Sequence, residues 1–474
     1  MGAGPTGILA SQLLTKHGVE VVLVEAGDFD SESMLTLRDY NFKSPSKMIH
    51  GVHKVGGGTN GWKGRVSRFP QSAIESKDKS GNRTWPIEWK EIETAYSVLA
   101  KVLNFTPIEN RPLREELHCC DACEQYFNIS PFQFLKPDLF RNLFKSFESN
   151  VLLDKHLRTY CKRIRNSENS LIIECEKEVS GSLVTINFEV DILFVAAGCL
   201  QSTALVKRSF PGESQRFPIG IYLQEHFDGY IGRLHIRKKD MRCLSSFALD
   251  YNRKLKNVEF GVGLSAKNHG DLHWHLEISP LARIYAFDPM SNRFNLPPIL
   301  LKLFFGIERL ISAPIFRVSN IVNRLFGRQT FSLWLKGEEF PYEKSELAIE
   351  SENSKKVIYK HRVSRTTTRQ MWVEINSFKQ ELNRRNLGKV VFSPYINLLR
   401  RIVTGANWHP LGSMRMHSSG PAALNADLSL KFESRIFCID SSSFPTGAHH
   451  NPTAMSLTLT TLAVHKLLDT KTVL

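Results

Sequence analysis

The stretch that decides the fold of the first part of the chain is GAGPTG, residues 2–7. It forms a G-x-G-x-x-G pattern, whose glycines let the backbone turn tightly and approach a pyrophosphate at a helix N-terminus. Such a pattern also occurs in ordinary glycine-rich turns, so the residues that follow must decide between the two interpretations.

Those residues favour a dinucleotide-binding unit. An apolar, helix-like run covers 8–14, and a strand-like run covers 19–24. Glu25 then stands 18 residues after Gly7, close to where an acidic residue accepts ribose hydroxyls in this kind of unit. Helix, strand and acid occur in the expected order, so we predict that Gly2, Gly4, Gly7 and Glu25 bind a dinucleotide.

One element of the unit does not precede the motif. A buried strand normally leads into the first glycine, yet only Met1 stands before Gly2. That strand would lie within the sheet, and without it apolar surface and backbone polar groups would lose their partners. We expect a misassigned start, a fragment, or another segment in the strand's place.

Composition is that of a globular protein of two or three domains: 474 residues, 42% hydrophobic and 23% charged. An excess of 62 Lys+Arg over 47 Asp+Glu gives a net charge of +15. These charges are spread along the chain and no recognition motif accompanies them, which argues against a nucleic-acid-binding protein. A solvated basic surface is the favoured interpretation.

Eight cysteines are too sparse for a disulfide scaffold in a chain of this length. The run HCCDAC at 118–123 resembles half of a metal site, but no second Cys/His pair follows at zinc-like spacing, so we predict no metal. No signal peptide opens the chain and no uncharged apolar run reaches about 20 residues. We therefore expect a cytoplasmic protein.

Three further blocks carry recognisable patterns. Residues 54–69 read KVGGGTNGWKGRVSRF, residues 407–416 read NWHPLGSMRM, and residues 440–453 read DSSSFPTGAHHNPT. Together with residues 2–7 they resemble the glucose–methanol–choline (GMC) oxidoreductase family, in the family's order and over nearly the whole chain. The stretches AAGCLQS at 196–202 and EHFD at 225–228 are also similar to family segments.

The resemblance implies an α/β fold with FAD as cofactor. A Rossmann-like FAD-binding domain, with a parallel sheet whose first strand is missing, would comprise residues 1–70, 148–228 and 402–474. Residues 71–147 and 229–401 would form a lid region and an α+β substrate domain with a mainly antiparallel sheet. The resemblance adds these cofactor-binding residues to the dinucleotide set: Gly57, Gly58, Thr59, Asn60, Trp62, Ala197, Gly198, Asp440, Asn451 and Pro452.

The same resemblance implies the catalytic residues. Oxidising an alcohol requires loss of the hydroxyl proton and departure of a hydride, and a neutral imidazole suits the proton step. By resemblance His409 is the general base, and Asn451 donates its amide to the substrate oxygen. His449 and His450 are adjacent, so at most one would face the flavin, and we rank Asn451 ahead of both. His450 remains a candidate for shaping the pocket.

Two further features leave alternatives open. His50 precedes the glycine cluster in a spacing similar to that of family members that attach flavin covalently, although a loop histidine is the simpler interpretation. Residues 296–326 have apolar residues at helical spacing, with Lys302, Arg309, Arg317 and Arg324 on the polar face and Pro314 as an expected break. A core-facing helix pair with a solvated basic face is favoured, with peripheral membrane contact as the alternative.

We therefore expect an FAD-dependent oxidoreductase acting on a CH–OH donor, a small-molecule alcohol or sugar. The WKGR version of the glycine block at 62–65 looks most like bacterial members that act on sugars or polyols. Oxygen, a quinone or a cytochrome would reoxidise the flavin. The alternative is a catalytically degenerate or truncated flavin-binding relative, against which the presence of both His409 and Asn451 argues.

Overall fold

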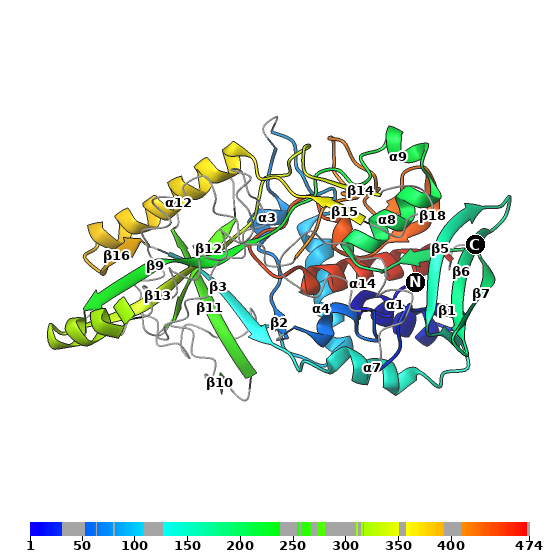
Figure 1. Cartoon of the computed structure of the whole chain (residues 1–474), viewed down its shortest axis with the longest axis horizontal. Coiled ribbons are helices and arrows are strands. Elements are labelled where there is room, and N and C mark those ends of the chain that lie inside the picture. The colour runs from blue at the N-terminus through cyan, green and yellow to red at the C-terminus, as the bar shows by residue number, and fades with distance from the viewer. Residues whose placement is uncertain are drawn as a thin grey trace.

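The computed structural model is elongated, with helices and small sheets at one end and a large sheet at the other (Figure 1). It describes residues 1–30, 53–62, 64–78, 81–108, 127–237, 254–255, 258–266, 273–279, 310, 314–315, 317–349, 357–392 and 409–471. Among these residues no helix is long and apolar enough to cross a membrane.

The first helix forms where the sequence predicts it. Helix α1 (Pro5–Lys16) begins with proline at its first turn, where the missing N–H costs nothing, and it is buried from Thr6 to Thr15. Strand β1 (Val21–Val24) follows and pairs in parallel with β4 (Leu153–His156). A second parallel pair joins β8 (Leu193–Val195) to β18 (Glu433–Cys438), with β17 (Ser429–Leu430) antiparallel at its edge.

Met1 and Gly2 lie between these two parallel pairs. The Met1 amino group donates to Phe194 O at 2.7 Å, and Ala196 N donates to Met1 O at 2.8 Å. On the other side Gly2 N donates to Val24 O at 2.7 Å. Two residues thus bridge the position where the sequence lacks a full strand.

Helices cover this end of the molecule. The long helix α14 (Pro452–Lys471) packs against α1 and α4 (Trp89–Val102), and Lys466 of α14 forms an ion pair with Glu91 at 2.8 Å. Strands β5 (Thr159–Asn166), β6 (Leu171–Val179) and β7 (Ser182–Val190) make a separate antiparallel sheet at the outer edge (Figure 1). The other helices at this end are α3 (Gln71–Ile74), α7 (Leu139–Phe147), α8 (Cys199–Ser209) and α9 (Glu213–Arg216).

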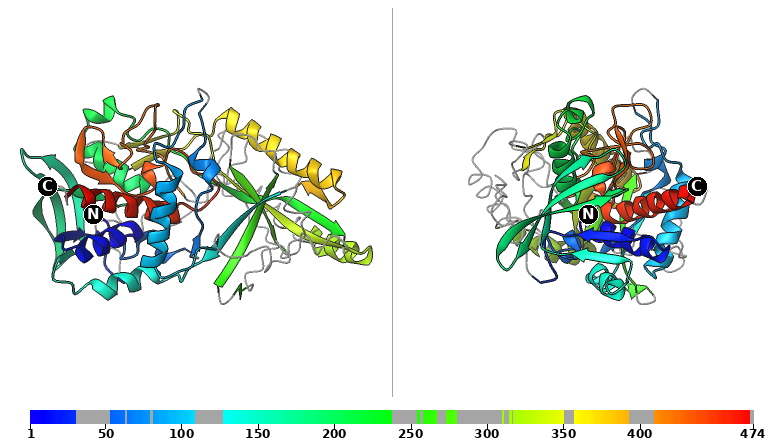
Figure 2. Two further views of the ribbon diagram at one scale, coloured as in Figure 1. Left: turned by 180° about the vertical axis from the view of Figure 1, so that it is seen from behind. Right: turned by 90° about the vertical axis from the view of Figure 1, so that its right-hand side faces the viewer.

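The other end is one antiparallel sheet of eight strands. Its order is β16 (Gly388–Phe392), β9 (Phe227–Arg237), β13 (Arg328–Gly337), β12 (Trp274–Ser279), β11 (Val258–Ala266), β3 (Phe127–Phe134) and β2 (Arg65–Val66), with β10 (Lys254–Leu255) paired to β11. Helix α12 (Arg365–Arg384) lies across it, as the left view of Figure 2 shows. The hairpin β14 (Glu346–Ile349) and β15 (Val357–Lys360) lies beside α8.

The favoured sequence interpretation of 296–326 is wrong for the part that the structure describes. Residues 317–325 are helical, but the helix does not turn its apolar side to the core. Leu325 is 81% exposed and Phe326 is 76% exposed. Pro314 itself is helical, while its neighbours at 311–313 lie outside the described residues.

Candidate active site

A cavity of ≈ 460 Å³ opens where three helices begin. Its wall includes the first residues of α1, of α8 and of α14. Each helix N-terminus carries unpaired backbone N–H groups and a partial positive charge, which together favour an anion. Convergence of three such ends on one cavity suits a pyrophosphate.

Two glycines of the turns at this cavity are required by close backbone approach. A Cβ on Gly7 would lie 1.8 Å from Gly2 O, and one on Gly57 would lie 2.9 Å from the Cα of Gly4. Gly57 also has φ +51°, a conformation that costs other residues strain. No side chain fits between the first glycine turn and η1 (Gly57–Asn60), so both present bare backbone to a ligand.

Glu25 is buried at the end of β1 and lines the cavity. Its carboxylate accepts from Ala3 N at 2.7 Å and from Gly27 N at 2.9 Å. Burial raises its pKa, against the effect of these backbone donors. A carboxylate has about four acceptor positions, so Glu25 can hold the glycine turn and still accept from a ligand hydroxyl.

Asp440 connects the two halves of the cavity wall. It caps η5 (Ser441–Ser443) by accepting from Ser442 N at 2.9 Å, and it also accepts from the Ser202 hydroxyl of α8. The same hydroxyl accepts from Ala197 N at 3.0 Å. Burial raises the pKa of Asp440.

The remaining residues of the second glycine block differ in placement. Thr59 lines the cavity, and its hydroxyl donates to Gly56 O at 2.5 Å. Trp62 lines it too, with its indole N–H donating to Pro137 O at 3.0 Å. Asn60 is not part of the wall. Its side-chain amide donates to Gly57 O at 2.8 Å and to Val55 O at 3.1 Å. Asn60 therefore holds the turn from behind.

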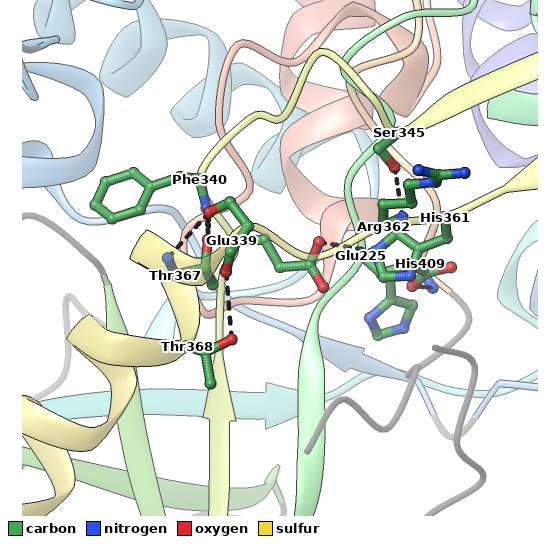
Figure 3. A network of polar contacts seen from close by, with 10 residues as sticks. Glu225, Glu339, Phe340, Ser345, His361, Arg362, Thr367, Thr368 and His409 are labelled. Atoms are coloured by element: carbon green, nitrogen blue, oxygen red, sulfur yellow. Dashed lines mark hydrogen bonds and ion pairs between the residues drawn. The ribbon is translucent and has the colours of Figure 1, made fainter. Parts of the chain in front are cut away.

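His409 stands at the cavity wall and is held through its backbone. Its N–H donates to the buried Glu225 carboxylate at 2.8 Å. Figure 3 shows Glu225 and His409 together with His361 and Glu339, whose side chains form a buried pair at 2.8 Å. Burial lowers the pKa of His361, but the charges of Glu339 and Glu225 outweigh it and raise that pKa overall.

The His409 ring contacts a second histidine, His226. The two Nδ1 atoms lie 3.2 Å apart, and His226 Nε2 lies 3.0 Å from Gly447 O. A carbonyl oxygen only accepts, so His226 Nε2 carries the proton. Burial lowers the pKa of His226 to about 4, which keeps the ring neutral and its Nδ1 an acceptor. His409 must then donate from Nδ1, and its lone pair lies on Nε2.

Asn451 lines the cavity with His409, immediately before α14. His449 and His450 do not line it. Their rings contact each other at a tilt of 36°, with centroids 3.9 Å apart, and the His449 ring packs against that of His275 of the large sheet with centroids 4.5 Å apart. Burial lowers the pKa of each well below its ordinary value.

The turn before Asn451 is held by a buried acid. Glu338 accepts from Ala448 N at 2.6 Å and from His273 N at 2.7 Å. Ala448 has φ +47°, which a non-glycine residue rarely adopts and which these surroundings must maintain. Burial raises the pKa of Glu338 to about 7.

Most of the residues predicted from sequence therefore meet at one cavity, and Gly7 and Asn60 support it from outside the wall. The wall includes the predicted residues Gly2, Gly4, Glu25, Gly57, Gly58, Thr59, Trp62, Ala197, Gly198, His409, Asp440, Asn451 and Pro452. His50 and the cysteines at 119, 120 and 123 lie outside the described residues.

Sequence reasoning missed several residues. His53, Tyr160, Gln201 and Ser441 also line the cavity. Gln201 and Ser441 lie within the blocks 196–202 and 440–453 but received no role, and neither His53 nor Tyr160 lies in a quoted block. Residues 225–228 were recognised as a family segment, yet neither Glu225 nor His226 received a role. Only their position beside His409 indicates a role for these two residues.

The cavity fits FAD on three observations from this structure. Three helix N-termini and side-chain-free glycine turns suit a pyrophosphate, and the Glu25 carboxylate suits ribose hydroxyls. His409 and Asn451 stand at the same wall, where a reacting ring would need a base and a donor.

Comparison with solved structures shows the class of fold. The chain is similar over 99% of its length to pyridoxine 4-oxidase from Mesorbium loti, with a TM-score of 0.60, 14% identity and 98% of that chain covered. It is similar over 99% of its length to a fungal aryl-alcohol oxidase, with a TM-score of 0.58, 10% identity and 98% of that chain covered. Both likenesses concern the fold.

A family model supports the resemblance that the motifs carry. Residues 350–460 match the family model described as GMC oxidoreductase. The resemblance to the GMC oxidoreductase family that the motifs indicate is thereby confirmed. A comparison with curated protein sequences finds no match.

Proposed function

We propose that this protein is an FAD-dependent oxidoreductase that oxidises the CH–OH group of a small-molecule alcohol or sugar, with His409 as general base. One observation carries the proposal: the contacts of His226 leave the His409 lone pair on Nε2, at the wall of a cavity suited to a dinucleotide. The likeness in fold to two proteins whose names are those of alcohol oxidases supports it.

FAD, when bound, supplies the hydride acceptor. The chain supplies the proton chemistry. His409 Nε2 takes the hydroxyl proton, and the imidazolium that forms is then doubly protonated. Its Nδ1–H remains donated to His226, whose ring is held in turn by Gly447 O.

Asn451 has a different role because an amide does not titrate near neutral pH. Its side-chain N–H groups donate to the substrate oxygen as negative charge develops there. The Glu225 carboxylate accepts from the His409 backbone N–H and so fixes the base relative to the wall. Groups that are already held in place need no reorganisation when the reaction occurs.

The test is the visible spectrum of the purified protein, reconstituted with FAD and followed without oxygen. Bleaching of the flavin bands by one of a panel of sugars, polyols, aromatic alcohols and pyridoxine would support the proposal and identify the substrate class. A flavin that binds but is bleached by none of them would support a catalytically degenerate relative instead. A protein that takes up no FAD would contradict the proposal at its first step.

A further inference from the structure

The helix at residues 317–325 presents an apolar surface to solvent. Its exposed large side chains, with those on either side of it, are Ile315, Val318, Ile321, Val322, Leu325 and Phe326. Solvent reaches 63% of Ile321, 81% of Leu325 and 76% of Phe326. We call this set the apolar ridge. Scattered apolar residues are normal on a surface, but six within residues 315–326, four of them on the helix, form an exposed patch.

The opposite side of the same helix faces the protein and is polar. Asn323 donates to Ser319 O at 2.7 Å and to the Thr330 hydroxyl at 3.1 Å, and it contacts His235 Nδ1 at 3.1 Å. Asn320 accepts from Thr330 N at 3.4 Å. The helix is therefore attached to β13 and β9 by its polar residues, which is the reverse of an ordinary surface helix.

The charge around the ridge is positive. Arg317, Arg324 and Arg328 are exposed beside it, and no Asp or Glu occurs between residues 310 and 337. His235, which contacts the helix, has its pKa lowered to about 4 by burial and then by the charges of Arg233, Lys389 and Arg328. Positive charges from β9, β13 and β16 thus converge on the base of the helix.

We infer that the apolar ridge docks into the surface of an anionic lipid bilayer. Apolar side chains rimmed by arginine, in a stretch without acidic residues from 310 to 337, match the boundary between acyl chains and anionic headgroups. The helix lies at the end of the molecule remote from the N-terminus, seen in yellow-green at the left of Figure 1, so docking leaves the proposed active site uncovered. A second copy of this chain is a poorer occupant, because two identical basic rims would repel each other.

The test uses flotation of the full-length protein with vesicles. One set contains equal parts phosphatidylcholine and phosphatidylglycerol, and the other contains phosphatidylcholine alone. We expect binding to the anionic set, weakened by salt. The double variant Leu325→Asp/Phe326→Asp should bind at least about tenfold more weakly, because it removes the largest exposed apolar groups. Arg317→Gln and Arg324→Gln should each weaken binding about fivefold.

The matched control is Val151→Asp/Leu183→Asp, which changes two exposed apolar residues at the other end of the molecule. It should bind anionic vesicles as the wild type does, and both double variants should keep the wild-type melting temperature. No binding of the wild type at low ionic strength would overturn the inference. Equal losses in both double variants would do so too. A further outcome is a wild type that self-associates without binding vesicles. If Leu325→Asp/Phe326→Asp abolishes that self-association, the partner of the apolar ridge is a second copy of this chain and not a bilayer.

Discussion

His226 and His409 are joined Nδ1 to Nδ1 at 3.2 Å, and the backbone oxygen of Gly447 decides the direction of that hydrogen bond. The Gly447 oxygen can only accept, so the proton of His226 is on Nε2 and its Nδ1 is an acceptor. The proton of His409 is therefore on Nδ1. The outcome is a base whose lone pair is on Nε2. His226 is therefore a positioning residue for the proposed reaction.

His226→Leu removes the acceptor of the His409 Nδ1–H, and with it the contact that places the His409 lone pair on Nε2. We expect the rate of substrate-driven flavin reduction to fall by about 10²- to 10⁴-fold, with its pH profile altered. His226→Asn should recover part of that loss, because an Asn oxygen can accept where Nδ1 did. Anaerobic stopped-flow reduction across pH measures both. Leucine and asparagine variants with identical rates and pH profiles would refute the tautomer argument.

His409→Ala removes the proposed base itself. FAD should still bind, because the glycine turns and Glu25 are unchanged, but substrate should no longer bleach it at a measurable rate. Asn451→Ala should retain slow reduction, since it removes one hydrogen bond to the oxygen while the base remains. Absorbance of bound FAD before and after substrate addition separates the two. An unchanged reduction rate in His409→Ala would remove it as base.

Gly7→Ala tests the first glycine turn. Its Cβ would lie 1.8 Å from Gly2 O, so α1 or the turn must shift. We expect FAD affinity to fall by about 10- to 100-fold, the equivalent of 1–3 kcal/mol of overpacking. Gly212→Ala is the control, because a Cβ there meets nothing within 4 Å. Fluorescence titration with FAD measures both, and equal affinities would contradict the structure at this turn.

Glu338→Gln tests the turn before Asn451 through pH. Burial raises the pKa of Glu338 from 4.5 to about 7, so the folded protein holds a proton that the unfolded chain releases. The stability this group contributes is present below about pH 4.5 and is lost as pH rises through 7. The wild type should therefore lose up to about 3 kcal/mol relative to Glu338→Gln between about pH 5 and pH 8. Urea unfolding of both proteins at each pH gives the difference in free energy of unfolding. A wild type that gains stability relative to Glu338→Gln as pH rises would contradict the raised pKa of Glu338.

Local patterns predicted much of what surrounds the cavity. A G-x-G-x-x-G turn, the helix after it and the acid at 25 follow from backbone sterics within about 25 residues, and the structure brings Gly2, Gly4 and Glu25 to the wall. Helix α1 and strand β1 also form close to where the runs at 8–14 and 19–24 predict them. Such features depend on neighbours in the chain, so the sequence carries their signal directly.

Other features depend on partners far away in the chain. His226 gains its role from His409, 183 residues away, and Glu338 from Ala448, 110 residues away. Residues 317–325 have a helical apolar period, but whether that face lies inward or outward depends on what Asn323 can bond on β13 and β9. The hydrophobic periodicity of the sequence is the same whether the apolar face of the helix is buried or exposed.

The sequence by itself determined the helix periods, the glycine turns and the family resemblance, because these arise from backbone geometry and from motifs that need no neighbour. Only the tertiary structure decided which histidine contacts His409, which nitrogen carries its proton, and which side of the 317–325 helix meets solvent. The physical reason is that hydrogen-bond direction and burial belong to pairs of groups, and such pairs form only when distant segments pack together.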